Sequence, residues 1–114
     1  DQSPAMMDAL LPLVPVSCCV DVGHLWKQAT DPVPCLDAWL SRTRVIHLHG
    51  VGTRDHKGLS LTGQERLDPV VSMLAERFKG VLTFEVFSEK DFLDCQTTFA
   101  QALTRVQSIP PVMP

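Results

Sequence analysis

Short apolar runs alternate with amphipathic segments along this chain. Three runs are rich in β-branched and aromatic residues and predict buried strands: residues 16–24 (VSCCVDVGH), 44–48 (RVIHL) and 80–87 (GVLTFEVF). Four segments predict helices: residues 4–13, residues 34–42, and the stretches that follow Gly63 and Ser88. The resulting order, α-β-α-β-α-β-α, predicts an α/β fold in which parallel strands are joined by right-handed crossovers.

The two C-terminal helices carry the clearest signals. Thr62 and Glu65 have the spacing of a capping box, and Gly80 ends the helix that follows. The apolar positions of that helix are spaced as one buried face: Leu67, Val70, Val71, Leu74 and Phe78. We expect Ser88 to cap the last helix, whose apolar stripe comprises Phe92, Phe99, Leu103 and Val106. The final residues, SIPPVMP, predict an irregular tail.

Composition narrows the class of protein. The chain has 114 residues, 45% of them hydrophobic, and a net charge of −3, which suits one globular domain or part of one. An acidic chain is a poor binder of nucleic acid, and no apolar run has the length of a membrane span. The four cysteines form no CxxC pair, and no basic start precedes an apolar stretch. We therefore expect reduced thiols and a cytoplasmic location.

Ligand-type side chains gather where each predicted strand ends. They are Asp21 and His24, then His47 and His49 with Asp55 and His56 in the next loop, and finally Glu85. Parallel strands end at one edge of a sheet, and strand alternation puts His47 with His49, and Glu85 with Thr83, on one side. Mixed imidazole and carboxylate donors predict a divalent metal site for Zn, Mn, Fe or Co.

Each of these residues also has a structural interpretation. A single buried histidine often serves only as a hydrogen-bonded core residue, and Asp21 before Gly23 is also typical of a turn. Arg54 and Lys57 suit an ordinary solvated loop equally well. The metal-site prediction therefore depends on the set as a whole.

Three stretches resemble a known superfamily. DVGH at 21–24, HLHGVGTRDHKGL at 47–59 and LTFEV at 82–86 resemble the last three strands of the xylose-isomerase-like TIM barrels, which include the endonuclease-IV-like enzymes. The HLHG…RDH form is most similar to the cobamide-remodelling phosphodiesterases, and the match runs from about residue 14 to 104. The resemblance implies that residues 1–114 form strands six to eight of one incomplete barrel domain, because a complete barrel needs roughly 250 residues.

The resemblance also assigns roles to residues. It implies five metal ligands: Asp21, His24, His47, His56 and Glu85. Asp55 stays open, because endonuclease-like members have Asp-x-His in this loop whereas Asp55 and His56 are adjacent. We expect catalytic roles for Glu85 and His49, and substrate phosphate contacts from Arg54 and Lys57.

The expected function is that of a fragment of a metal-dependent phosphodiester hydrolase acting on the nucleotide loop of cobamides. One alternative is a metal-dependent sugar isomerase or epimerase, in which Glu85 is a ligand or an acid-base group. Another is an inactive, self-associating module whose histidines bind metal only adventitiously. The expected partner is a small phosphodiester or sugar, with neither nucleic acid nor membrane. Three strands with two open edges predict that the chain alone is inactive and self-associates or partly unfolds.

Overall fold

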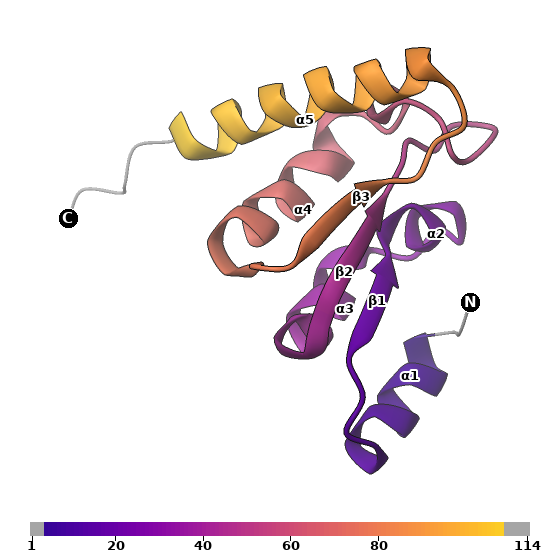
Figure 1. The fold of residues 1–114 in the computed structure, drawn as a ribbon, viewed down its shortest axis with the longest axis vertical. Coiled ribbons are helices and arrows are strands. Elements are labelled where there is room, and N and C mark those ends of the chain that lie inside the picture. The colour runs from indigo at the N-terminus through magenta and orange to yellow at the C-terminus, as the bar shows by residue number, and fades with distance from the viewer. Residues whose placement is uncertain (1–3, 109–114) are drawn as a thin grey trace.

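The computed structural model describes residues 4–108, which form one three-stranded parallel sheet with helices packed against it (Figure 1). The strands are β1 (Cys18–Asp21), β2 (Thr43–Leu48) and β3 (Val81–Phe84), and they lie in the order β1-β2-β3. Both strand pairs are parallel. The prediction of an α/β fold with parallel strands is therefore confirmed, whereas the last residues of the tail, 109–114, lie outside the described part.

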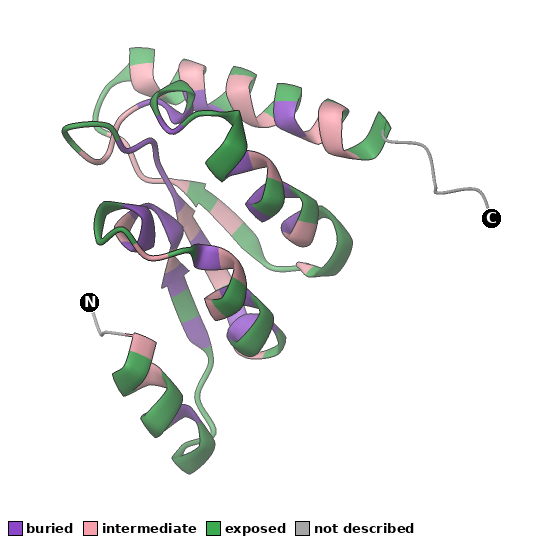
Figure 2. Cartoon of the chain, turned by 180° about the vertical axis from the view of Figure 1, so that it is seen from behind, coloured by how far each residue is buried: buried purple, intermediate pink, exposed green. Residues whose placement is uncertain are grey.

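Within residues 4–108, five α-helices accompany the sheet. They are α1 (Pro4–Leu10), α2 (Val22–Lys27), α3 (Pro32–Trp39), α4 (Gln64–Arg77) and α5 (Glu89–Ser108), with 3-10 turns at Leu11–Leu13, Leu40–Arg42 and Leu59–Leu61. Helices α2, α3 and α4 lie against one face of the sheet, α5 packs along α4, and α1 lies near β1 (Figures 1 and 2). Right-handed crossovers between strands that are added in one direction place their helices on a single face.

The hydrophobic core fills the space between that face and the helices. The strands contribute Val20, Ile46 and Leu48, each no more than 4% exposed. Helix α4 contributes Leu67, Val70, Val71 and Leu74, so its predicted buried face is confirmed for these four positions. Phe78 is only partly buried, because the helix ends at Arg77 and Phe78 is its C-cap.

Two strands are shorter than the sequence predicts, and the difference matters for the site. The run at 16–24 pairs only over Cys18–Asp21, because the Asp21 carboxylate accepts a hydrogen bond from the backbone of His24 and starts α2. The run at 80–87 pairs as β3 only to Phe84. The helix predicted at 34–42 begins earlier, after the cap Asp31, and its last turn is 3-10.

One predicted helix cap is wrong and the other is confirmed. The Thr62 hydroxyl accepts a hydrogen bond from the backbone N–H of Val51 instead of capping α4, so Thr62 and Glu65 form no capping box. The Ser88 hydroxyl accepts from the backbone N–H of Asp91 and caps α5 as expected. The predicted stripe of α5 is wrong for Phe92, which is 41% exposed, although Phe99, Leu103 and Val106 pack on the core beside the buried Cys95 and Ala102.

The opposite face of the sheet is open. Its side chains alternate with the core positions and are exposed or half-buried: Cys19, Asp21, Val45, His47, Val81 and Thr83. All four cysteines are free, although only Cys18 and Cys95 are buried. None of the helices between residues 4 and 108 has both the length and the hydropathy to cross a membrane.

We expect the isolated 114-residue chain to self-associate through the outer edge of β3. The edge strand has unpaired backbone groups, and its Val81 side chain is 61% exposed. Val81→Lys should reduce the association, because a lysine on an edge strand disfavours strand pairing between molecules. Sedimentation velocity over a concentration series measures this. A wild-type chain that stays monomeric and unfolds cooperatively would contradict the expectation.

Candidate metal centre

The strand register brings three ligand-type residues to one end of the open face. Asp21 is the last residue of β1, and it pairs directly with His47 of β2, which in turn pairs with Thr83 of β3. Glu85 lies one residue beyond β3; its backbone N–H donates to the carbonyl of Leu48, and its carboxylate contacts His47 on the open face. The predicted convergence of Asp21, His47 and Glu85 at the carboxyl ends of the strands is confirmed.

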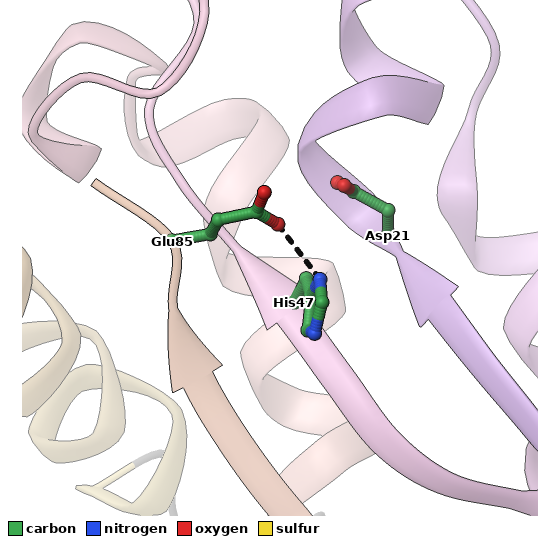
Figure 3. Close-up of side chains that lie close together, drawn as sticks. All are labelled: Asp21, His47 and Glu85. Atoms are coloured by element: carbon green, nitrogen blue, oxygen red, sulfur yellow. Dashed lines mark ion pairs between the residues drawn. The ribbon is translucent and has the colours of Figure 1, made fainter. Parts of the chain in front are cut away.

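These three residues form a compact donor set. One donor atom from each of Asp21, His47 and Glu85 can be chosen so that all three lie within 4.8 Å of one another. The two carboxylates lean toward each other above the imidazole, whose Nδ1 lies 2.7 Å from Glu85 Oε2 (Figure 3). The side chains of His47 and Glu85 are 33% and 35% exposed, so the set is reachable from solvent.

Glu85 supports the fit of a cation. Its Oε2 atom is shielded from solvent, yet it has no hydrogen bond of acceptable geometry to any described residue. The 2.7 Å contact with His47 Nδ1 thus lacks the direction of a hydrogen bond. A shielded carboxylate oxygen without a directed partner is costly, and a metal ion placed among the three donors would satisfy it.

Asp21 is held in the ionised state. Burial raises the pKa of its carboxyl group, but hydrogen bonds from the His49 ring and the His24 backbone outweigh burial, so the pKa lies below its usual value. The carboxylate is therefore anionic at neutral pH, as a metal ligand must be.

His24 and His56 flank the donor set without joining it. The Nδ1 atom of His24, in the first turn of α2, lies 3.6 Å from Asp21 Oδ2. The Nε2 atom of His56, in the loop after β2, lies 3.4 Å from Glu85 Oε1. The two further metal ligands that the resemblance implies therefore sit beside the carboxylates. Asp55 contacts His56 Nδ1 at 3.1 Å, a hydrogen bond that lowers the pKa of Asp55.

His49 takes a different position from the one expected of a catalytic residue. Strand β2 ends at Leu48, so alternation no longer dictates which way His49 faces. The side chain is fully buried, and both ring nitrogens have protein partners, Asp21 and the backbone of His56. A buried ring of this kind has no path to a substrate, in contrast to His47 on the open face.

The two predicted phosphate contacts lie in the exposed loop between Gly50 and Gly58. Arg54 is exposed and Lys57 is half-buried. Lys57 lies near enough to Asp91 that its charge helps to lower the pKa of Asp91, after the hydrogen bond from Ser88 and that from the Gly58 backbone. Lys27, which was not predicted from the sequence, joins this region: its Nζ donates a 3.0 Å hydrogen bond to the carbonyl of Thr53.

Two further residues of the site escaped prediction from the sequence. Phe87 is 82% exposed and stacks on the His56 ring at 4.9 Å between centroids. Gly23 packs so closely under the His49 ring that a Cβ there would lie 2.1 Å from His49 Nε2. The DVGH stretch was the one sequence signal for Gly23. A glycine within a helix is unfavourable, so its presence there indicates a position with no room for a side chain.

Closure of the loop depends on Gly50. Its backbone forms both bridge bonds with Lys57, and a Cβ at residue 50 would lie 1.7 Å from the carbonyl oxygen of Gly58. We expect Gly50→Ala to destabilise the protein by about 1–3 kcal/mol, the usual cost of forcing extra atoms into a packed site. Gly52→Ala is the matched control, because its Cβ would meet nothing closer than 3.9 Å. Urea unfolding measures the free energy of unfolding of both variants. Equal losses of stability would contradict the conclusion that closure of the loop depends on Gly50.

A cavity of about 320 Å³ adjoins the donor set on the β1 side. Asp21, His24 and His47 line one part of it, and Met7 of α1 and Trp39 of α3 line another. Its volume is that of a site for a small organic molecule.

Comparison of the chain with protein-family models, with curated proteins and with solved structures returned no match.

Proposed function

We propose that this chain is the C-terminal part of a TIM-barrel enzyme and carries part of a metal-dependent phosphodiester hydrolase site. The barrel proposal is supported by the order of the strands and by the placement of the helices on one face only. A barrel keeps its helices outside and turns the other face of the sheet inward, and this placement fits that arrangement. Polar ligands at the carboxyl ends of its strands are where barrel enzymes place their active sites.

The observation that carries the function is the donor set of Asp21, His47 and Glu85 beside a cavity. Three protein ligands leave coordination positions open for water and substrate, which is typical of catalytic rather than structural sites. A bound Zn, Mn, Fe or Co ion would there acidify a water and polarise a phosphoryl oxygen.

The surrounding residues supply charge and hydrogen-bonding groups. The Arg54 guanidinium, on the exposed loop, suits bidentate contact with a phosphate oxygen, and Lys57 supplies a second positive charge. His24 and His56 extend the set of nitrogen donors past each carboxylate, which favours chemistry that uses more than one metal. A phosphodiester such as the nucleotide loop of a cobamide is the substrate class that this combination fits.

A metal-dependent sugar isomerase or epimerase is the second candidate, and one observation favours it. Among residues 4–108, Asp21, His47 and Glu85 are the one group of three whose donor atoms come together. A single metal suits the binding of neighbouring sugar hydroxyls. Glu85, as a ligand or an acid-base group, would serve that reaction.

Hydrolysis of bis(p-nitrophenyl) phosphate by the complete enzyme of which we propose this chain to be part tests the proposal, because the chain alone is expected to be inactive. We expect turnover that EDTA abolishes and that Zn²⁺ or Mn²⁺ restores. Arg54→Ala and Lys57→Ala should each raise KM about tenfold or more, because a hydrogen bond to a charged group is worth roughly 1.5–3 kcal/mol. Absence of phosphodiester turnover together with metal-dependent interconversion of aldoses and ketoses would favour the second candidate. Absence of both activities from the protein would favour an inactive module.

A further inference from the structure

Each ring nitrogen of His49 has its own hydrogen-bond partner. Its Nδ1 accepts a 2.9 Å bond from the backbone N–H of His56, so this nitrogen carries no proton. Its Nε2 lies 3.0 Å from Asp21 Oδ1, and a carboxylate can only accept, so Nε2 carries the proton and donates it. The His49 side chain is fully buried, and each of its ring nitrogens contacts a different part of the site.

The bond to His56 holds an unusual piece of backbone. His56 has a φ of 58°, in the left-handed region that few residues other than glycine adopt. Its ring stacks on that of His49, with 4.2 Å between centroids and 10° between planes, and the His56 ring in turn contacts Glu85. The Nδ1 acceptor and the stacking surface of His49 thus support the loop conformation that brings His56 to Glu85.

The bond to Asp21 acts on the other side of the donor set. Asp21 receives one hydrogen bond from the His49 ring and one from the backbone of His24, and both reach the same oxygen, Oδ1. The second oxygen, Oδ2, receives neither of these bonds and lies 3.6 Å from His24 Nδ1. Gly23 makes room for this arrangement, because any larger residue would push the His49 ring away from Asp21.

We propose that His49 is a positioning residue of the metal centre: its Nε2–H orients the ligand carboxylate of Asp21, and its Nδ1 fixes the loop that carries His56. The proposal rests on the metal centre inferred above, and it gives His49 no contact with substrate. Groups that hydrogen-bond to metal ligands commonly contribute about 10- to 100-fold to metal affinity, because they fix the orientation of the ligand.

Two isosteric variants separate the two bonds of His49. In His49→Asn the amide oxygen lies near the position of Nδ1, where it can accept from His56, but the side chain is too short to reach Asp21. In His49→Gln the amide nitrogen reaches the position of Nε2 and can donate to Asp21, while the acceptor near His56 is lost. A purely structural role for a buried ring would not distinguish between the two substitutions in this way.

Zn²⁺ titration by calorimetry measures the first bond. We expect His49→Asn to lose about 10- to 100-fold in Zn²⁺ affinity and His49→Gln to stay within about threefold of wild type. Gly23→Ala should lose affinity as His49→Asn does, and it should cost nothing further when added to His49→Ala. Circular dichroism establishes that the variants compared are folded.

Limited trypsin digestion measures the second bond, because Arg54 and Lys57 provide cleavage sites within the loop. Cleavage after these two residues should accelerate in His49→Gln and stay near the wild-type rate in His49→Asn. This crossed pattern supports the proposal. The proposal is overturned if both variants lose Zn²⁺ affinity and the resistance of the loop to trypsin, or if neither variant loses either property. Failure of wild-type protein to bind Zn²⁺ would instead refute the metal centre, and the digestion would still report on the link between His49 and the loop.

Discussion

Replacing His47 by alanine is expected to lower divalent metal affinity by more than about 100-fold, the upper end of what loss of an outer hydrogen-bonding partner costs. His47 is the central member of the donor set, paired in register with Asp21 and 2.7 Å from Glu85. Glu85→Gln should have a similar effect, because it removes a ligand oxygen and a negative charge that offsets that of the metal. Calorimetry with Zn²⁺ and Mn²⁺ on the metal-free protein measures both.

The fold should survive these two substitutions. Both side chains lie on the open face and are about one third exposed, and a pair so placed contributes roughly 0–1 kcal/mol to stability. Glu89→Gln is the matched control, because it makes the same chemical change four residues further along at an exposed position. Wild-type affinity in both His47→Ala and Glu85→Gln would show that the two residues are structural and that the metal centre does not exist.

Replacing Ile46 by alanine is expected to destabilise the chain by about 2–5 kcal/mol. Ile46 is fully buried at the centre of the middle strand, where a truncated side chain leaves a cavity that the surrounding helices cannot fill. Val45, the preceding residue, faces the open side and is only half-buried. Val45→Ala should lower the free energy of unfolding by less than about 1 kcal/mol, because truncating a half-buried side chain on the open face leaves no enclosed cavity.

Urea unfolding of the 114-residue chain at low protein concentration measures the difference. Comparable losses in Ile46→Ala and Val45→Ala would contradict the finding that the helices cover one face of the sheet and leave the other open. The comparison is sharp because the two residues are adjacent on one strand and differ by a single methylene group.

The parallel direction of the strands and the convergence of Asp21, His47 and Glu85 were predictable from the hydrophobic pattern of the sequence. Apolar runs separated by helical segments predict parallel strands, and parallel strands bring Asp21, His47 and Glu85 to one edge whatever the details of the loops. The alternation that puts Glu85 on the side of Thr83 also held, although β3 ends one residue earlier, because the backbone N–H of Glu85 still pairs with the carbonyl of Leu48.

The position of His49 was not predictable, because it depends on contacts between distant segments. Alternation along an unbroken strand would have turned His49 to the side of His47. The strand instead stops at Leu48, and the bridge between Gly50 and Lys57 folds the chain back so that His56 covers the His49 ring. Nothing local in HLHG shows that Gly23, on another strand-helix connection, leaves space for that ring.

The misplaced helix cap has a similar cause. Thr62 has the residue type and spacing of a capping residue, but its hydroxyl is used by the backbone of Val51, eleven residues earlier in the chain. Asp21, by contrast, lies within an apolar run that resembles a continuing strand, yet it ends β1 and caps α2. In both cases the side chain could bond either a nearby or a distant backbone group. The sequence pattern alone does not show which of these hydrogen bonds forms.

The most direct test of the metal centre is anomalous diffraction from crystals of the protein grown with Zn²⁺ and collected at the zinc edge. The account predicts a peak about 2.0–2.2 Å from an oxygen of Asp21, a ring nitrogen of His47 and an oxygen of Glu85. Zinc bound only at other residues, or no peak at saturating Zn²⁺ with these three side chains in place, would contradict it.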